Sequence, residues 1–288
     1  MIIVTGATGQ LGRLIVEKLL DRVSADQVGV SVRDSQKAAD LEARGVRVRQ
    51  GDFDDADSLR HAFEGATQIL IVSSNARASG GDPLAQHHNA IDAAKAVGTK
   101  RIVYTSHMAA GATSAFPPAR DHAATEAMLA ESGLAWTALR HGFYAESGLM
   151  MNGEGLKTGM IEAPADGKVS WTTHADLAEA DAIILADEGR FDGPTPPLTA
   201  AEAIDLDEFA AICSDVLGKP VSRKVLSDEE LKAKMAARGA PEGAANMALG
   251  LYIAARNGEF ATVDPTLEAM LGRRPIDMRT LIAGKNAS

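Results

Sequence analysis

The chain has 288 residues, of which 45% are hydrophobic and 24% charged, as is ordinary for a globular protein that buries a substantial core. Its formal net charge of −10 excludes the basic excess that nucleic acid or an anionic membrane surface requires, so we expect neither partner. The single cysteine, Cys213, excludes an intramolecular disulfide and any CxxC metal or redox motif. Because no apolar run approaches the roughly 20 residues that span a bilayer, and no leader pattern is visible, we expect a cytoplasmic protein.

The first 140 residues predict strands and helices in alternation. Short apolar runs, typical of buried strands, lie at residues 2–5, 28–32, 46–49, 69–72, 101–105 and 136–139. Segments with helical patterning lie between them, at residues 11–19 and near 35–44, 55–64, 84–97 and 121–132. Strands separated by helices of this length predict βαβ units, a parallel sheet and right-handed crossovers.

Beyond Tyr144, glycines and prolines break the chain into short pieces, and three better helices follow near 205–217, 227–238 and 241–257. Asp205 and Glu208 have the spacing of a capping box, and the apolar face of that helix ends at Gly218. We therefore expect an α/β fold with a doubly wound parallel (Rossmann) sheet and a smaller, mostly helical C-terminal cap. The expected domains are residues 1–150, which bind a dinucleotide, and residues 151–288, which bind substrate and interleave with the sheet.

A glycine-spaced loop follows the first strand directly. It reads G-x-x-G-x-x-G and consists of Gly6, Ala7, Thr8, Gly9, Gln10, Leu11 and Gly12. Such a turn between strand and helix lets backbone N–H groups approach a pyrophosphate at the positive end of a helix dipole. The loop therefore predicts a dinucleotide cofactor, with a purely structural turn as the alternative. Because the loop lacks the Gly-Lys-Ser/Thr ending of a P-loop, ATP or GTP hydrolysis is disfavoured.

The second strand ends at Arg33. An arginine here accommodates the 2′-phosphate of NADP, whereas an acid would bind the ribose hydroxyls of NAD. Lys37, four residues further on, adds a second positive charge, while Asp34 keeps the NAD alternative open. Both cations could also be solvated surface residues. We favour NADP(H) over NAD(H).

In open parallel sheets, ligands bind outside the carboxyl ends of the strands. The third strand ends near Asp52 and Phe53, which could border the adenine ring. The fourth ends at Ser73, Ser74 and Asn75, whose small polar side chains suit ribose and phosphate groups. Both segments could equally be ordinary loops.

The last two strands lead to residues that could carry chemistry. His107 follows the fifth strand, where its imidazole could donate a proton, although structural histidines are common. Phe143 and Tyr144 follow the sixth strand and could wall a flat substrate, with hinge packing as the alternative. We expect no metal site: His122 and Glu126, four residues apart without a third ligand, are more typical of a surface hydrogen bond.

These patterns together resemble the NmrA-like group of atypical short-chain dehydrogenase/reductases. The resemblance rests on the segments at 4–12, 32–33, 51–53, 104–106 and 139–144, and extends weakly through 174–178 and 205–220. Within the group, the chain is most similar to the bacterial quinone and triphenylmethane reductases. The resemblance implies NADPH held by the glycine loop, Arg33 and the ends of strands three to six, which adds Arg140, Gly142, Phe143 and Tyr144. The implied substrate site lies near Asn75, His107, His122, Phe143 and Tyr144.

One departure from the typical short-chain dehydrogenases concerns their Tyr-x-x-x-Lys pair. The residues four positions after Tyr104, Tyr144 and Tyr252 are Met108, Gly148 and Arg256. Carbonyl–alcohol interconversion by the usual route is therefore disfavoured, as is an epimerase, since those relatives depend on the same pair. A quinone accepts hydride directly, which requires positioning and exclusion of water more than a dedicated acid.

Two functional hypotheses follow. The first is an NADPH-dependent reductase of a flat conjugated acceptor such as a quinone, with catalytic candidates His107, His122 and Tyr144. The alternative is a non-catalytic, redox-sensing regulator of the NmrA type. The reductase would use NADPH, and the regulator would bind NAD(P). The expected partner of the enzyme is a small aromatic or quinone-like molecule, and homo-oligomer formation is compatible with either hypothesis.

Overall fold

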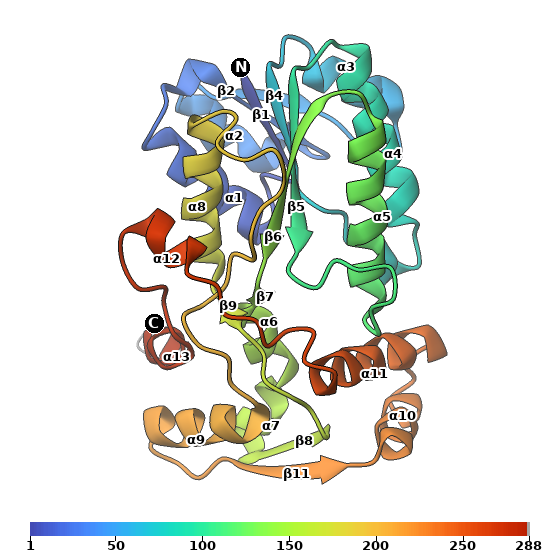
Figure 1. Ribbon diagram of the computed structural model, residues 1–288, viewed down its shortest axis with the longest axis vertical. Helices are drawn as coiled ribbons and strands as arrows, with labels where there is room; N and C mark the ends of the chain where they lie inside the picture. The colour runs from blue at the N-terminus through green and yellow to red at the C-terminus, as the bar shows by residue number, and fades with distance from the viewer. Residues whose placement is uncertain (287–288) are drawn as a thin grey trace. The chain divides into compact units, whose positions relative to one another are not determined.

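The computed structural model describes residues 1–286 and divides into two compact units whose segments alternate along the chain (Figure 1). The sheet unit comprises Met1–Ser106, Asp121–Arg140 and His174–Pro196. The second unit comprises His107–Arg120, His141–Thr173 and Pro197–Ser288. A stretch beyond residue 150, His174–Pro196, therefore belongs with the sheet.

The sheet unit is built on a seven-stranded sheet with the order β10-β6-β5-β4-β1-β2-β3. Its strands are β1 (Ile2–Thr5), β2 (Val28–Val32), β3 (Arg47–Gln50), β4 (Gln68–Ile71), β5 (Arg101–His107), β6 (Ala135–His141) and β10 (Gly193–Pro194). The pairings β1–β2, β2–β3, β1–β4, β4–β5 and β6–β10 are all parallel. The chain winds outward from β1 in one direction and from β4 in the other, so the expected doubly wound sheet is confirmed, with its switch point between β1 and β4.

Helices cover both faces of this sheet. Figure 1 shows α1 (Gln10–Leu20), α2 (Ala39–Ala43) and α8 (His174–Ala186) on one face, and α3 (Ala56–Phe63), α4 (Pro83–Ala96) and α5 (Pro117–Glu131) on the other. The expected helix near 35–44 is split into a 3₁₀ turn, η2 (Ser35–Ala38), and the short α2. The helix expected at 121–132 begins earlier, at Pro117, because proline is well tolerated in a first helical turn.

Local sequence explains where several of these helices start. Asp55 accepts hydrogen bonds from two N–H groups of the first turn of α3, and Asp82 does the same for α4, which opens with Pro83. Between the helices and the sheet lies a buried apolar cluster that includes Ile3 and Phe63. Burial of such side chains is the main source of stability of the unit.

The second unit is mostly helical, as expected. It contains α6 (Ala145–Met151), α7 (Gly153–Thr158), α9 (Leu206–Leu217), α10 (Asp228–Ala237), α11 (Glu242–Arg256), α12 (Thr266–Leu271) and α13 (Met278–Asn286). The capping box of Asp205 and Glu208 is present, and Gly218 ends α9 with φ +64°. Two short parallel pairs were not predicted: β8 (Met160–Pro164) with β11 (Ser222–Leu226), and β7 (Phe143–Tyr144) with β9 (Trp171–Thr172). Within residues 1–286, none of the helices combines the length and apolar character needed to cross a bilayer.

Candidate cofactor-binding cleft

A cleft of about 800 Å³ opens at the carboxyl ends of β1, β2, β3 and β4, entirely within the sheet unit. This is the edge at which doubly wound sheets bind their ligands, and the volume lies within the range of about 300–1,000 Å³ that small-molecule sites occupy. Among the residues expected to bind a cofactor, those lining the cleft are Gly6, Thr8, Gly9, Arg33, Lys37, Asp52, Phe53, Ser73, Ser74 and Asn75.

Close backbone packing shapes the glycine loop. Gly6 has φ +63°, and its carbonyl accepts a hydrogen bond from the Gly9 N–H at 2.9 Å. A Cβ on Gly12 would lie 2.4 Å from the same carbonyl oxygen, so only glycine lets α1 pack this closely against the loop. Gly12 itself, with Ala7, Gln10 and Leu11, is not among the lining residues.

The first turn of α1 has no side chain to cap it. Its N-cap is Gly9, which makes no side-chain hydrogen bond, and the first turn contains no acidic residue. α3 and α4, by contrast, begin at aspartates that accept from their first N–H groups. Because Gly9 lines the cleft, the positive end of α1 is directed at it, and this arrangement suits a pyrophosphate.

Two cations line the cleft at the end of β2. Arg33 and Lys37 are both exposed and both among the lining residues. Asp34, the acid that kept NAD open, accepts a hydrogen bond from the Gln36 N–H at 3.1 Å and caps η2. Asp34 is not among the lining residues, but its Oδ2 lies 4.0 Å from Lys37 Nζ, so one of the two cations of this rim is paired with a carboxylate. Arg33 and Lys37 still place two positive groups where they could bind a phosphate.

The loop after β4 is held by side chains of neighbouring elements. The Ser73 N–H donates to Thr105 Oγ1 at 2.8 Å, and the Ser74 N–H donates to His87 Nε2 at 2.8 Å. Thr105 lies near the carboxyl end of β5 and His87 lies on α4, so both contacts come from residues distant in sequence. The geometry of this rim therefore depends on side-chain hydrogen bonds.

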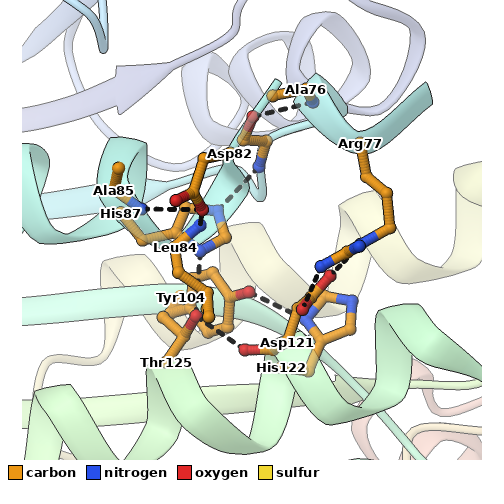
Figure 2. A network of polar contacts seen from close by, with 11 residues as sticks. Ala76, Arg77, Asp82, Leu84, Ala85, His87, Tyr104, Asp121, His122 and Thr125 are labelled. Carbon is orange, nitrogen blue, oxygen red and sulfur yellow. Dashed lines mark hydrogen bonds and ion pairs between the residues drawn. The ribbon is translucent and has the colours of Figure 1, made fainter. Parts of the chain in front are cut away.

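The N-terminal part of α5 holds the next segment of the same rim (Figure 2). Arg77 lies in the 3₁₀ turn η3 (Ala76–Ser79) and donates to both carboxylate oxygens of Asp121, at 2.5 and 2.6 Å. This hydrogen-bonded carboxylate raises the pKa of Arg77. On the following residue of α5, His122 Nδ1 lies 2.8 Å from the hydroxyl of the fully buried Tyr104. His122 is thus part of a polar network that also anchors the rim.

Arg140, expected to bind the cofactor, forms an ion pair within the sheet unit. Its guanidinium donates to both carboxylate oxygens of Glu126, at 3.1 and 2.7 Å, and Ser106 Oγ donates to the same carboxylate at 2.6 Å. The hydrogen bonds to Glu126 raise the pKa of Arg140. Glu126 is buried, so its interpretation as half of a surface hydrogen bond is wrong: the carboxylate balances a guanidinium inside the fold. Arg140 does not line the cleft.

The remaining expected residues lie in the second unit. The ring of His107 contacts those of Phe116, Phe143 and Phe260, with centroids 5.5–6.1 Å apart. Burial, with a smaller contribution from His141, lowers the pKa of His107 to about 3, so its imidazole is neutral near pH 7.

Gly142 and Tyr144 adjoin this aromatic cluster. A Cβ on Gly142 would lie 2.2 Å from Thr172 Oγ1, so packing within the unit accounts for this glycine. The Tyr144 hydroxyl lies 3.4 Å from His141 Nδ1. Within the described part of the chain, no group of three or more histidine, cysteine or carboxylate side chains could hold a metal ion.

Sequence reasoning missed several lining residues. Gly51, Asp54 and Ala76 directly adjoin predicted positions, so a wider window around each strand end would have included them. Gln86 is different, because it reaches the cleft from α4 and carries no local signal.

A doubly wound sheet with a glycine loop and a cationic rim at its switch point defines a dinucleotide-binding protein. Residues 6–188 match the model of the NAD(P)H-binding family. Quinone oxidoreductase 2 of Escherichia coli is 38% identical over 273 residues, covering 94% of each chain. An NmrA-like family domain-containing oxidoreductase of Aspergillus flavus is 30% identical, covering 97% of this chain and 93% of that protein. The chain therefore belongs to the NAD(P)H-binding family, in its NmrA-like group.

Two solved structures extend the likeness to the whole fold. The NADPH-dependent quinone oxidoreductase of E. coli in complex with NADPH superposes with a TM-score of 0.92 at 35% identity, covering 99% of this chain and 100% of that one. The triphenylmethane reductase of Citrobacter sp. in complex with NADP(H) gives a TM-score of 0.86 at 33% identity, covering 99% of each chain. The resemblance inferred from the sequence motifs is confirmed.

Proposed function

We propose that this protein is an NADPH-dependent reductase that transfers hydride to a flat conjugated acceptor such as a quinone. The observation that carries the proposal is the cleft lined by the glycine loop, Arg33 and Lys37, in a chain that shares 38% identity with a quinone oxidoreductase along nearly its whole length. The cofactor is NADP(H), and the acceptor is a small aromatic or quinone-like molecule.

Each rim of the cleft has its own role in holding the cofactor. The uncapped first turn of α1 receives the pyrophosphate through its N–H groups. Arg33 and Lys37 bind the 2′-phosphate, and Asp52 and Phe53 border the adenine. The loop Ser73–Asn75 lines the cleft after β4, where its small polar side chains would hold ribose and phosphate groups of the cofactor.

When bound, NADPH supplies a hydride, and reduction of a quinone also consumes a proton. Of the three candidate donors, His107 is unsuited to the role because its lowered pKa, about 3, leaves no imidazolium at neutral pH. His122 adjoins Asp121, which is tied to Arg77 beside the cleft-lining Ala76. His122, whose Nδ1 lies 2.8 Å from the Tyr104 hydroxyl, and Tyr144 therefore stay the candidate proton donors, in place of a Tyr-x-x-x-Lys pair.

Steady-state NADPH oxidation with a panel of quinones tests the proposal. We expect turnover well above the uncatalysed rate with at least one quinone, and slower turnover with NADH. Tight NADPH binding without turnover of any quinone or dye would overturn it and restore the redox-sensing alternative. At present the alternative is not favoured, because the similar proteins are named as reductases.

Two further expectations concern the surroundings of the enzyme. A cytoplasmic location stays a prediction, and cell fractionation checks it. Homo-oligomer formation stays open to sedimentation measurements. Neither bears on the chemistry of the cleft.

A further inference from the structure

Three neighbouring residues of α4 reach two different rims of the cleft. Gln86 Nε2 donates to Asp54 Oδ2 at 2.8 Å, and Gln86 Oε1 accepts from Ser74 Oγ at 2.5 Å. A single side chain therefore bridges the loop after β3 and the loop after β4. Asn89 adds a second contact to the first of these loops, since its Nδ2 donates to the Phe53 carbonyl at 2.9 Å.

The side chain of His87 holds the loop after β4 by accepting a hydrogen bond from the backbone of that loop (Figure 2). Its Nε2 lies 2.8 Å from the Ser74 N–H, which can only donate, so this nitrogen carries a lone pair. On the other side of the ring, Nδ1 lies 2.8 Å from Thr125 Oγ1, whose hydroxyl donates to the Asp121 carbonyl at 2.9 Å. The Thr125 oxygen is therefore the acceptor, and the neutral Nδ1–H tautomer satisfies every contact.

The surroundings of His87 disfavour a second proton. Only 2% of the residue is exposed, and the Tyr104 ring packs edge-on against it at 5.2 Å. Burial lowers the pKa of His87 to about 4, against a smaller opposing effect of Asp82 at the start of α4. The groups facing it from α5 and from the loop after β4, Thr125 and Ser74, are uncharged. Protonation at Nε2 would remove the acceptor of the Ser74 N–H.

We propose that Gln86 and His87 are positioning residues of the cofactor cleft, which hold the loops after β3 and β4 in the shape that receives the two halves of the dinucleotide. His87 does so only as the neutral Nδ1–H tautomer. The inference rests on the proposed function for one point alone, that NADP(H) is the ligand. Gln86 itself lines the cleft and bridges two of its loops, whereas His87 acts through Ser74, which lines the cleft.

Titration of NADP⁺ against matched variants tests the proposal. H87A leaves a partly buried Ser74 N–H without an acceptor and should weaken NADP⁺ binding by about tenfold. H87Q keeps a carbonyl acceptor that cannot be protonated, and should recover most of this loss. H88A is the matched control, because His88 is the next residue of the helix but is exposed and lies 3.3 Å from Asp92. Equal affinities of H87A and H88A would overturn the inference.

The pH profile separates positioning from general structural support. Wild-type affinity for NADP⁺, which withstands acid better than NADPH, should fall as pH approaches 4, more steeply than that of H87Q. Protonation of the adenine and phosphate groups of NADP⁺ affects both proteins equally. The difference between the two pH profiles therefore reports on His87 alone. Parallel profiles would contradict the proposal.

The tautomer can be observed in the wild-type protein itself. Nitrogen-15 NMR of labelled histidines at pH 7 should show His87 protonated at Nδ1 alone, and this result decides the question even where H87A fails to fold. An Nε2–H tautomer would overturn the inference while leaving the reductase proposal intact. A wild-type protein that binds no NADP⁺ would overturn both.

Discussion

Two rims of the same cleft are built in opposite ways. The glycine loop after β1 takes its shape from the absence of side chains, since Gly12 packs where a Cβ would lie 2.4 Å from the Gly6 carbonyl oxygen. The loop after β4 takes its shape from side chains, because His87 and Thr105 accept from its backbone N–H groups. The shape of the glycine loop is determined by seven consecutive residues, so it can be predicted from the sequence. The second rim depends on partners 13 and 32 positions away, so only the folded chain reveals it.

Replacing Gly12 with alanine should break the first rim and give the largest effect. The new Cβ would meet backbone atoms of Gly6 at 2.4 and 2.8 Å, which cannot move without displacing the loop. Overpacking of this kind costs roughly 3 kcal/mol, or about a hundredfold in NADPH affinity if the loop absorbs the strain. Fluorescence titration of NADPH measures the loss, and thermal unfolding reports any strain taken up by the fold.

Gly243→Ala is the control for this prediction. Gly243 lies in α11, and a Cβ there would meet nothing within 4 Å, so alanine should leave binding unchanged and support the helix. A Gly12→Ala protein that binds NADPH as tightly as the control would show that the close packing is not what shapes this rim.

The next effect is on stability and concerns His107, which is partly buried in the aromatic cluster. His107 has a folded-state pKa of about 3 against an ordinary value of 6.5, so the unfolded chain binds a proton first as pH falls. Stability contributed by the neutral ring is therefore complete above about pH 6.5 and is lost progressively between that pH and about 3. At pH 5 the loss is about 2 kcal/mol. Replacing His107 with phenylalanine should remove it.

Urea unfolding at pH 7 and pH 5 measures the contribution of His107 to the unfolding free energy. The decrease in unfolding free energy between the two pH values should be smaller by about 2 kcal/mol in H107F than in the wild type. H88A, which removes an exposed histidine, should keep the wild-type decrease. An unchanged decrease in H107F would show that the aromatic cluster admits a charged imidazole, and would return His107 to the list of proton donors.

Arg33→Ala tests the cationic rim and should have an intermediate effect. A charge-assisted contact to a 2′-phosphate contributes about 1.5–3 kcal/mol, so NADPH affinity should fall at least about tenfold, while NADH affinity should change little. The exposed Arg60 of α3, which pairs with Asp57, provides the matched control. Equal losses for the two cofactors would place Arg33 away from the phosphate.

Most of the fold could be predicted from the sequence because its signals are local. Apolar runs placed six strands to within a few residues, and glycine spacing located the cofactor loop. α8 could not be assigned to the sheet unit in this way. Its residues are buried nearly all round, so no single apolar face indicated that it packs with α1.

The site was predictable only where a residue type alone defines a role. Gln86 and His87 read as polar residues of an amphipathic helix, and nothing near them in sequence indicates that they reach Asp54 and Ser74. Arg140 is the opposite case, in which the sequence indicated a binding role that the cleft does not show. A cation at a strand end suits a phosphate, but its partner in the structure is the carboxylate of Glu126, contributed by another element.

The smallest effect should come from Arg77→Ala, which removes the ion pair between η3 and Asp121 of α5. The turn that carries Arg77 also carries the cleft-lining Ala76 and Ser79, and the ion pair with Asp121 fastens it to α5. Because 43% of the Arg77 side chain is exposed, the pair is screened by solvent and contributes about 0.2–1 kcal/mol. NADPH affinity should therefore fall about threefold, and by less at high salt.

A double-mutant cycle with Asp121→Ala isolates the contact between the two side chains. Removing Asp121 alone should weaken binding as much as removing Arg77, and removing both should add little further loss. Strictly additive losses would mean that η3 is held by the backbone. In that case the backbone would shape part of the loop after β4, as it shapes the glycine loop. Only the hydrogen bonds of His87 and Thr105 would then distinguish the two rims.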